Sequence, residues 1–268
     1  MLSSFFMQLN GFTDVRAESN TLKKGRLLWK QLQEPAAVQF IHGRGNRDMN
    51  VFDIIGPVMV GPSSSHTAGA VRIGRVVRAL LGEQPSDAVI GLHGSFARTH
   101  KGHGTDKAII AGLLDMQPDD GRIMESMELA RRAGMKYRFE AAVLKDAHPN
   151  TALITASART GACVTVQGSS VGGGSIVINK INGMDVELTG QYHTLVISHT
   201  DTPGTVAGVT GLLAVNGINI AAMRVYRSFR GGEAVMVIET DQAVRRDLGL
   251  LIERLDKIKR AALIEPVD

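Results

Sequence analysis

The spacing of apolar residues changes several times along the chain, and each change predicts a new element of secondary structure. Behind the breaker pair Gly61-Pro62, apolar residues at helical spacing predict a helix over 68–81, with Ser64 or Ser65 as its N-cap. An apolar run over 87–93 predicts a buried strand. The same reasoning predicts helices over 105–114 and 118–133, and strands over 137–141, 152–158, 162–167 and within 172–183.

The last part of the chain has an order of elements of its own. Its pattern predicts strand, helix, strand, strand, helix and strand, which is the ferredoxin-like arrangement. A unit of about 75 residues is large enough to build its own core. The predicted strands cover 193–199, 218–229, 233–240 and 261–267, and the predicted helices cover 203–215 and 243–258.

The first 48 residues show no such pattern, apart from a weak helical signal around Trp29. They could form an ordered extension that packs on the body or a poorly ordered addition, and the second interpretation is favoured. A fresh apolar segment begins at Met49, which we expect to be the natural start of the protein. We therefore expect an N-terminal extension (1–48), a main domain (49–183), a linker (184–191) and a C-terminal domain (192–268).

The composition is that of a soluble globular protein and excludes several classes of function. The 30 basic and 26 acidic residues give a formal net charge of +4, too small and too evenly spread to indicate nucleic-acid binding. No apolar run reaches the length of a membrane span. Cys163 is the only cysteine, so a reducing, cytoplasmic location fits, and a buried structural thiol is expected for it.

Polar chemistry is concentrated at the start of the first predicted helix. Ser63, Ser64, Ser65 and Thr67 supply four hydroxyl groups, and His66 lies among them. One interpretation is a well-capped helix N-terminus without a further role. The other is a site for a small anion, because free backbone N–H groups and the helix dipole attract a carboxylate or phosphate.

A second polar cluster follows the strand at 87–93. The segment 99–107 is polar and interrupted by glycines, so it predicts a loop, and Thr105 or Asp106 would cap the next helix. Its histidines are candidate bases, Lys101 is a candidate clamp for a carboxylate, and Asp106 is a candidate orienting acid.

Other kinds of site find less support in the sequence. A zinc site at His93, His100 and His103 lacks the usual ligand spacing, so no metal ligand is expected from this chain. The triple glycine at 172–174 precedes neither a Gly-Lys-Ser/Thr motif nor a helix, which excludes a P-loop. A serine hydrolase is disfavoured because no Gly-x-Ser-x-Gly elbow is present, and no lysine lies in a recognisable pyridoxal-phosphate context.

Several motifs carry a resemblance to known families. In the main domain they are Gly61-Pro62-Ser63-Ser64-Ser65-His66-Thr67, His93-Gly94-Ser95-Phe96-Ala97, Lys101-Gly102-His103-Gly104-Thr105-Asp106, His148-Pro149-Asn150-Thr151 and Ile181-Asn182-Gly183. As a set they resemble the β subunit of iron–sulfur-dependent L-serine dehydratases. In the last part, Asp201-Thr202-Pro203-Gly204 and Asn216-Gly217-Ile218-Asn219-Ile220 resemble an ACT domain, a small-molecule sensor of amino-acid metabolism.

The resemblance implies an α+β fold, with an α/β domain like the allosteric substrate-binding domain of phosphoglycerate dehydrogenases before a ferredoxin-like ACT domain. It implies a β subunit that works with an α subunit, as a heterodimer or larger assembly, to convert L-serine to pyruvate and ammonia. The α subunit would hold a [4Fe–4S] cluster, which needs three or four thiolates. ACT–ACT self-association is a further expectation. The alternative is a non-catalytic subunit that senses amino acids.

The resemblance also assigns roles to particular residues. Catalytic roles are expected for His66, Lys101, His103 and Asp106. Substrate-binding roles are expected for Ser63, Ser64, Ser65, Thr67, His93, Ser95, Thr105, His148 and Asn150. In the ACT domain, an effector is expected to bind at Asp201, Pro203, Gly204, Asn219 and Ile220.

Overall fold

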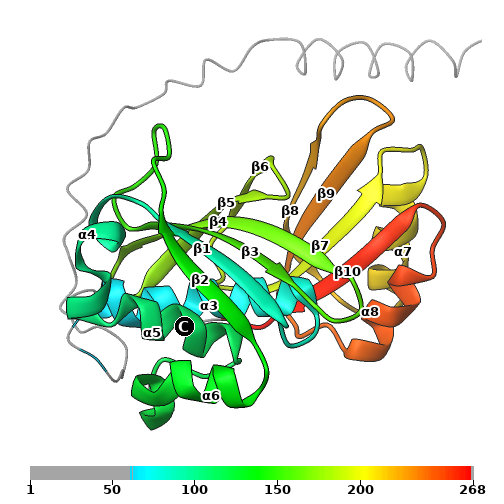
Figure 1. Cartoon of the computed structure of the whole chain (residues 1–268). Coiled ribbons are helices and arrows are strands. Elements are labelled where there is room, and N and C mark those ends of the chain that lie inside the picture. The colour runs from blue at the N-terminus through cyan, green and yellow to red at the C-terminus, as the bar shows by residue number, and fades with distance from the viewer. Residues whose placement is uncertain (1–60, 62, 267–268) are drawn as a thin grey trace, which may run out of the picture. The chain divides into compact units, whose positions relative to one another are not determined.

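The computed structural model describes Gly61 and residues 63–266, and the expectations for residues 1–48 and for Met49 lie outside this part of the chain. The described residues belong to one compact unit. It contains two sheets with helices (Figure 1), and this is the predicted α+β class. Within the described part, no helix combines the length and the apolar character that a membrane crossing requires.

The first sheet has six strands in the order β2-β1-β3-β4-β5-β6. β1 pairs in parallel with β2, and all other neighbours are antiparallel. Because one face of an antiparallel sheet can face solvent, burial alternates along β3, where Ala152, Ile154 and Ala156 are buried. The strands are β1 (Asp87–Leu92), β2 (Lys136–Ala141), β3 (Thr151–Ser157), β4 (Cys163–Gly172), β5 (Ser175–Ile181) and β6 (Met184–Leu188).

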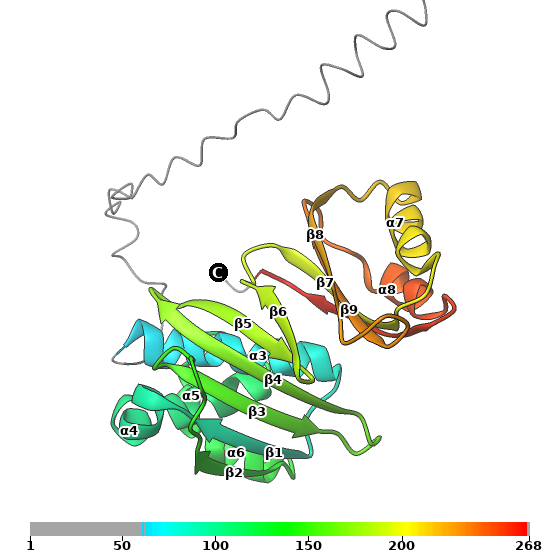
Figure 2. The same cartoon turned by 90° about the horizontal axis from the view of Figure 1, so that it is seen from above.

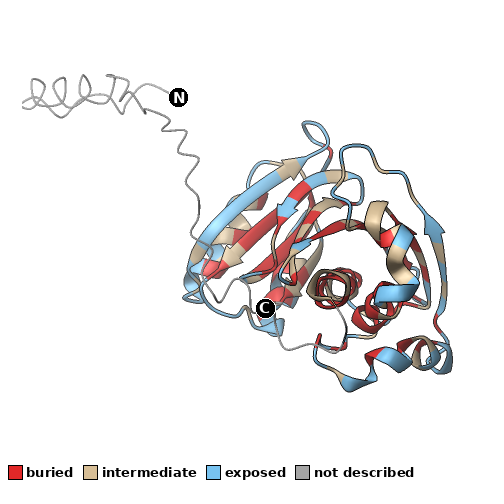
Figure 3. Ribbon diagram, turned by 90° about the vertical axis from the view of Figure 1, so that its left-hand side faces the viewer, coloured by how far each residue is buried: buried red, intermediate tan, exposed pale blue. Residues whose placement is uncertain are grey.

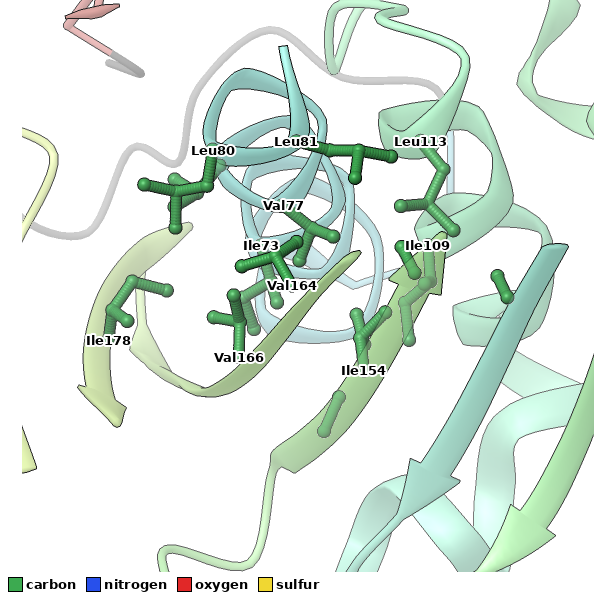
Figure 4. Close-up of a cluster of buried hydrophobic side chains, with 14 of the residues drawn as sticks. Ile73, Val77, Leu80, Leu81, Ile109, Leu113, Ile154, Val164, Val166 and Ile178 are labelled. Carbon is green, nitrogen blue, oxygen red and sulfur yellow. The ribbon is translucent and has the colours of Figure 1, made fainter. Parts of the chain in front are cut away.

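Helices cover the buried face of this sheet. α3 and α5 run along that face (Figure 2), and α3 contacts β3, β4 and β5. Apolar residues of α3 and α5 meet those of β3, β4 and β5 in a single core (Figure 4). The elements of this layer are the π-helical turn η1 (Ser64–Ala68), α3 (Gly69–Leu81), α4 (Gly94–His103), α5 (Thr105–Leu113), the 3-10 helix η2 (Gly121–Glu125) and α6 (Ser126–Arg132).

Two glycines allow α3 and α5 to pack backbone against backbone. A Cβ atom on Gly74 would lie 2.5 Å from the carbonyl oxygen of Ile109. A Cβ atom on Gly112 would lie 2.1 Å from the carbonyl oxygen of Val71. No side chain fits at either distance, so the crossing requires glycine on both helices.

The second sheet has the order β10-β7-β9-β8, which is the ferredoxin-like order predicted for the ACT domain. One face carries a core with Leu195, Val209 and Ile252. Other residues of the same sheet, among them Val196 and Ala262, are not part of this core. They belong to the buried hydrophobic cluster that includes α3 (buried positions are red in Figure 3). The elements are β7 (His193–Thr200), α7 (Thr205–Val215), β8 (Ile220–Arg227), β9 (Glu233–Thr240), α8 (Arg246–Glu253) and β10 (Ile258–Ile264).

Two segments that the sequence predicts to be irregular are regular. The predicted linker 184–191 begins with β6, which pairs with β5 and buries Val186 and Leu188. Its alternation of apolar and polar residues is a strand pattern only five residues long. The predicted loop 99–107 is occupied largely by α4, whose sole buried residue is Phe96. A helix with so little apolar surface has no helical periodicity to detect.

Three local predictions are also wrong. Ser63, and neither Ser64 nor Ser65, caps η1 by accepting a hydrogen bond from the His66 N–H. α5 has Gly104 at its N-cap, with a φ of 71°, in place of Thr105 or Asp106. Cys163 is exposed at the start of β4, so it is not a buried structural thiol.

Candidate functional site

The site begins where the chain enters the first helix. Ser63 has extended backbone angles, and its hydroxyl accepts from the His66 N–H at 3.4 Å. In η1 the Gly69 N–H reaches back five residues to the carbonyl oxygen of Ser64, which makes a π-type turn. Such turns are often found at functional sites. The turn places the imidazole of His66 beside α4, which η1 contacts.

The His66 ring has a hydroxyl group near each of its nitrogen atoms. Ser63 Oγ lies 3.3 Å from Nδ1, and Ser95 Oγ lies 3.4 Å from Nε2. The ring of Phe96 meets that of His66 edge-on, with the centroids 5.3 Å apart. The ring of His103 lies 4.9 Å from that of His66, centroid to centroid. Ser63 at the N-cap of η1 and three residues of α4 therefore surround one half-buried imidazole.

The environment of His66 favours its neutral form. Burial lowers the pKa of His66 below its usual value of 6.5, and the nearby charge of His103 lowers this pKa further. The exposed ring of His103 lies at the C-terminal end of α4, in its last turn. A neutral imidazole at pH 7 has one nitrogen free to accept a proton.

Two threonine hydroxyls, one in η1 and one at the start of α5, are buried without a hydrogen-bond partner in the described part of the chain. Thr67 in η1 has 2% of its surface exposed, and Thr105 at the start of α5 has none. Neither Oγ1 atom has a hydrogen-bond partner within the described part of the chain. η1 and α5 are in contact. Because buried polar groups are nearly always hydrogen-bonded, these two hydroxyls on contacting elements are candidate donors to a bound ligand.

The turn at residues 148–151 packs against the start of α4. Ser95 N–H donates to the carbonyl oxygen of Pro149 at 2.7 Å. A Cβ atom on Gly94 would lie only 2.6 Å from the same oxygen, and the φ of Gly94 is +56°, so glycine is required there. The His148 ring accepts a hydrogen bond from the N–H of Asn150, which holds it within its own turn.

The other predicted residues take different positions. His93 Nδ1 lies 3.2 Å from both the Leu144 N–H and the Ala142 carbonyl, so this ring is held against the segment after β2. Lys101 is exposed, and Ser64 and Ser65 are half-buried. The carboxylate of Asp106, which is largely buried, accepts from the Lys107 N–H at the start of α5.

Sequence reasoning missed Phe96 as a member of the site. Its side chain is fully buried and packs on His66. The signal was its place inside the His93–Ala97 motif, because a large apolar residue in a polar stretch is a candidate for packing under a functional side chain.

The zinc alternative brings together too few ligands. His100 Nδ1 donates to the carbonyl oxygen of Ala97 at 2.9 Å, and its ring stacks on Phe139 at a centroid distance of 6.5 Å. The hydrogen bond and the stacking contact of the His100 ring are therefore with Ala97 and Phe139, and neither is with His93 or His103. The described residues contain no group of three or more His, Cys, Asp or Glu side chains that could hold a metal ion.

The residues of this chain also do not fit a [4Fe–4S] cluster. Such a cluster is held by three or four thiolates, and the whole sequence contains one cysteine. That cysteine, Cys163, is exposed on β4, and no metal-ligating group of the described chain surrounds it.

The predicted effector residues of the ACT domain fall into two groups. Asp201 accepts hydrogen bonds from the Gly231 N–H and from Arg227, and these lower the pKa of its carboxyl group. Pro203 and Gly204, whose φ is +90°, precede α7. Asn219 precedes β8 and Ile220 is its first residue. Ile220 pairs with Thr240, as His193 does, so it is level with the start of β7, the end opposite to Asp201. One copy of the domain therefore does not bring the two groups together.

Known proteins resemble this chain over most of its length. The family model "Serine dehydratase beta chain" matches residues 50–139, and the model "ACT domain" matches residues 193–259. The "Probable L-serine dehydratase, beta chain" of Bacillus subtilis (strain 168) is 48% identical over 73% of this chain and 88% of its own. The "L-serine dehydratase, beta chain" of Peptoniphilus asaccharolyticus is 37% identical over 81% of this chain and 99% of its own. A "D-3-phosphoglycerate dehydrogenase" of Bacillus subtilis is 28% identical over 65% of this chain and 33% of its own. The chain therefore belongs to the family of L-serine dehydratase beta chains and ends in an ACT domain.

Proposed function

We propose that this chain is the β subunit of an L-serine dehydratase, which converts L-serine to pyruvate and ammonia together with an α subunit. The names of two relatives that match most of this chain support the substrate, and the words "beta chain" in those names support a partner. The observation that carries the proposal is the arrangement around His66, with a hydroxyl at each ring nitrogen and a second imidazole alongside.

The reaction requires removal of the weakly acidic proton on the Cα atom of serine, and His66 suits this step. Its lowered pKa keeps the ring neutral at pH 7, so a nitrogen can accept the proton. The hydroxyls of Ser63 and Ser95 fix the ring orientation. The neighbouring charge of His103 lowers the pKa of His66 in the same direction as burial does.

The buried hydroxyls suit the substrate carboxylate. Thr67 and Thr105 retain their full capacity to donate a hydrogen bond, since no group of the described chain uses it. Ser64 and Ser65 belong to the same turn as Thr67, and Lys101 adds a positive charge on α4. His93, His148, Asn150 and Asp106 hold the surrounding turns in place through the hydrogen bonds described above.

The iron–sulfur cluster implied by the family would come from the α subunit. This chain lacks the thiolates for it, so the complete enzyme would be a heterodimer or a larger assembly with this site at the subunit boundary. A cytoplasmic location is part of the same proposal. The ACT domain would regulate the enzyme, with self-association bringing Asp201, Pro203 and Gly204 of one copy toward Asn219 and Ile220 of another.

The second candidate function is an amino-acid sensor without catalytic residues. The similarity to a D-3-phosphoglycerate dehydrogenase over 65% of the chain favours it, because that relative carries out another reaction. In this case the hydroxyls around His66 would bind serine as a regulatory ligand, and the partner would supply all of the catalytic groups.

The two-subunit proposal is tested by expressing the chain alone and with its α partner under anaerobic conditions. Pyruvate formation from L-serine and iron content are then measured in both preparations. We expect both only when the partner is present. Pyruvate formation by the isolated chain would contradict the two-subunit assignment.

A further inference from the structure

A cavity of about 620 Å³ lies between the C-terminal half of α3 and the α8 and β10 part of the ACT domain. It is distinct from the candidate site, since neither His66 nor any residue of η1 or α4 lines it. Its most distinctive feature is a set of four arginines. Arg75 and Arg78 come from α3, Arg246 from the start of α8, and Arg260 from β10.

Three acidic residues, Asp115, Glu253 and Glu265, also line the cavity, and they balance only part of the charge of the four arginines. The carboxylate of Asp115 lies 3.6 Å from Arg75 Nε, and it also attracts Arg78. Glu253 is engaged by the N–H of Ala261. Arg246 and Arg260 have no acidic side chain within ion-pair distance in the described part of the chain.

Arg260 is held in place but lacks a full set of partners. Its guanidinium lies over Gly82, where a Cβ atom would come within 1.6 Å of one of its terminal nitrogens. Gly82 ends α3 with a φ of +77°, and the negative end of the helix dipole favours a cation at this position. The Nε atom of Arg260 is nevertheless buried without a hydrogen-bond partner. A guanidinium with an unused donor is suited to a ligand that accepts hydrogen bonds.

Burial also affects the neighbouring arginine. Burial lowers the pKa of Arg78, and this effect outweighs the opposing attraction of Asp115 and Glu83. A cation that is partly withdrawn from solvent and incompletely neutralised by its own chain gains from an anion, and guanidinium groups match carboxylate and phosphate groups geometrically.

We propose that this cavity binds a small-molecule anion that carries carboxylate or phosphate groups, held by Arg78, Arg246 and Arg260. The ligand would contact α3 and the ACT domain at once. α3 follows η1 directly, so the anion site and the candidate catalytic site lie along one helix. The site differs from the effector residues Asp201 to Gly204 and Asn219 to Ile220, none of which line it.

The test is isothermal titration calorimetry of the full-length chain with sodium phosphate and, separately, sodium citrate, at an ionic strength held constant with sodium chloride. We expect saturable binding of one anion per chain with at least one of the two probes. Arg246→Ala and Arg260→Gln should each weaken binding about tenfold or more. Arg245→Ala is the matched control, since it removes the same charge from the adjacent residue, which does not line the cavity.

Absence of saturable binding of either probe would overturn the proposal, as would equal weakening in all three variants. A preference for citrate assigns a carboxylated ligand, and a preference for phosphate assigns a phosphorylated one. If circular dichroism shows that Arg260→Gln does not fold, the test rests on Arg246→Ala. Arg246 is exposed at the first position of α8, so its replacement should leave the fold intact. The measurement needs neither serine nor the α subunit, so its outcome is independent of the proposed enzymatic function.

Discussion

The imidazole of His66 is the group on which the proposed chemistry depends. It is half-buried between two hydroxyl groups, a phenyl ring and a second imidazole. These neighbours fix its orientation and favour its neutral form, which are the two properties that a general base needs near pH 7. Both properties can be measured in the isolated chain without any substrate.

The pKa of His66 should therefore lie below 6.5, as measured by NMR titration of its ring resonances. His103→Gln should raise this pKa, because it removes the repelling charge, but should leave it below 6.5, because burial is the larger cause. Since the folded state disfavours the proton, the stabilisation linked to His66 is present above pH 6.5 and is lost as the pH falls through its folded-state pKa. A His66 ring that titrates at or above 6.5 would contradict this description.

Thr105 gives a second prediction at the level of single residues. Its buried hydroxyl has no partner, so Thr105→Val should leave the free energy of unfolding unchanged or slightly raised in denaturant titrations. In the assembled enzyme the same variant should raise the KM for serine about tenfold, since a hydrogen bond to the carboxylate is lost.

Thr151 is the matched control for Thr105. Its equally buried hydroxyl donates to the His148 carbonyl at 2.6 Å and lies 2.8 Å from Ser169 Oγ. Thr151→Val should therefore destabilise the fold by about 1–3 kcal/mol. Equal destabilisation by the two variants would show that the hydroxyl of Thr105 serves the fold and not a ligand.

Among the elements of the fold, the crossing of α3 and α5 is the contact least tolerant of change. Gly74→Ala would place a methyl group 2.5 Å from a backbone oxygen, which cannot move aside as a side chain can. We expect a loss of stability of about 1–3 kcal/mol, measured by chemical denaturation. Gly211→Ala in α7 should be neutral or stabilising by up to about 1 kcal/mol, because no atom lies within 4 Å of its new Cβ atom. A neutral Gly74→Ala would contradict the backbone contact.

The sequence predicts those elements whose apolar residues follow one period over enough length. The helix at 68–81 and the strand at 87–93 are confirmed, since both bury one continuous set of apolar residues. α4 was missed because it is stabilised by one buried phenyl ring and by the left-handed Gly104 at its end, and neither leaves a periodic signal. β6 was missed because five residues are too few to distinguish a strand from a linker.

The sequence predicts which types of residue belong to the candidate site, but it does not predict which of them contact one another. The density of hydroxyls and histidines in residues 63–67 and 99–107 marks both segments without any structure. His66 and His103 lie in two segments that β1 separates in the sequence. No local sequence pattern predicts that their side chains contact one another. The role of Gly94 against Pro149 is likewise visible only in three dimensions.

Considered as a whole molecule, the chain offers histidines and hydroxyls but only one thiol. Cys163 lies exposed on β4, and a single thiol does not suffice for the iron–sulfur cluster of the proposed enzyme. The ACT domain meets α3 through β10, and the arginine-lined cavity lies at this contact. The molecule thus combines one wall of a proposed active site with two places where small molecules could regulate it.

The most direct test of the central claim is the turnover of His66→Gln in the complex with the α subunit, assayed anaerobically at saturating L-serine. His100→Gln is the control, because it changes another imidazole of the same region that faces Phe139. We predict a loss of kcat of about 100-fold or more for His66→Gln and a near-normal kcat for His100→Gln. An unchanged kcat of His66→Gln, with only the half-saturating serine concentration altered, would contradict the catalytic assignment and support the sensor.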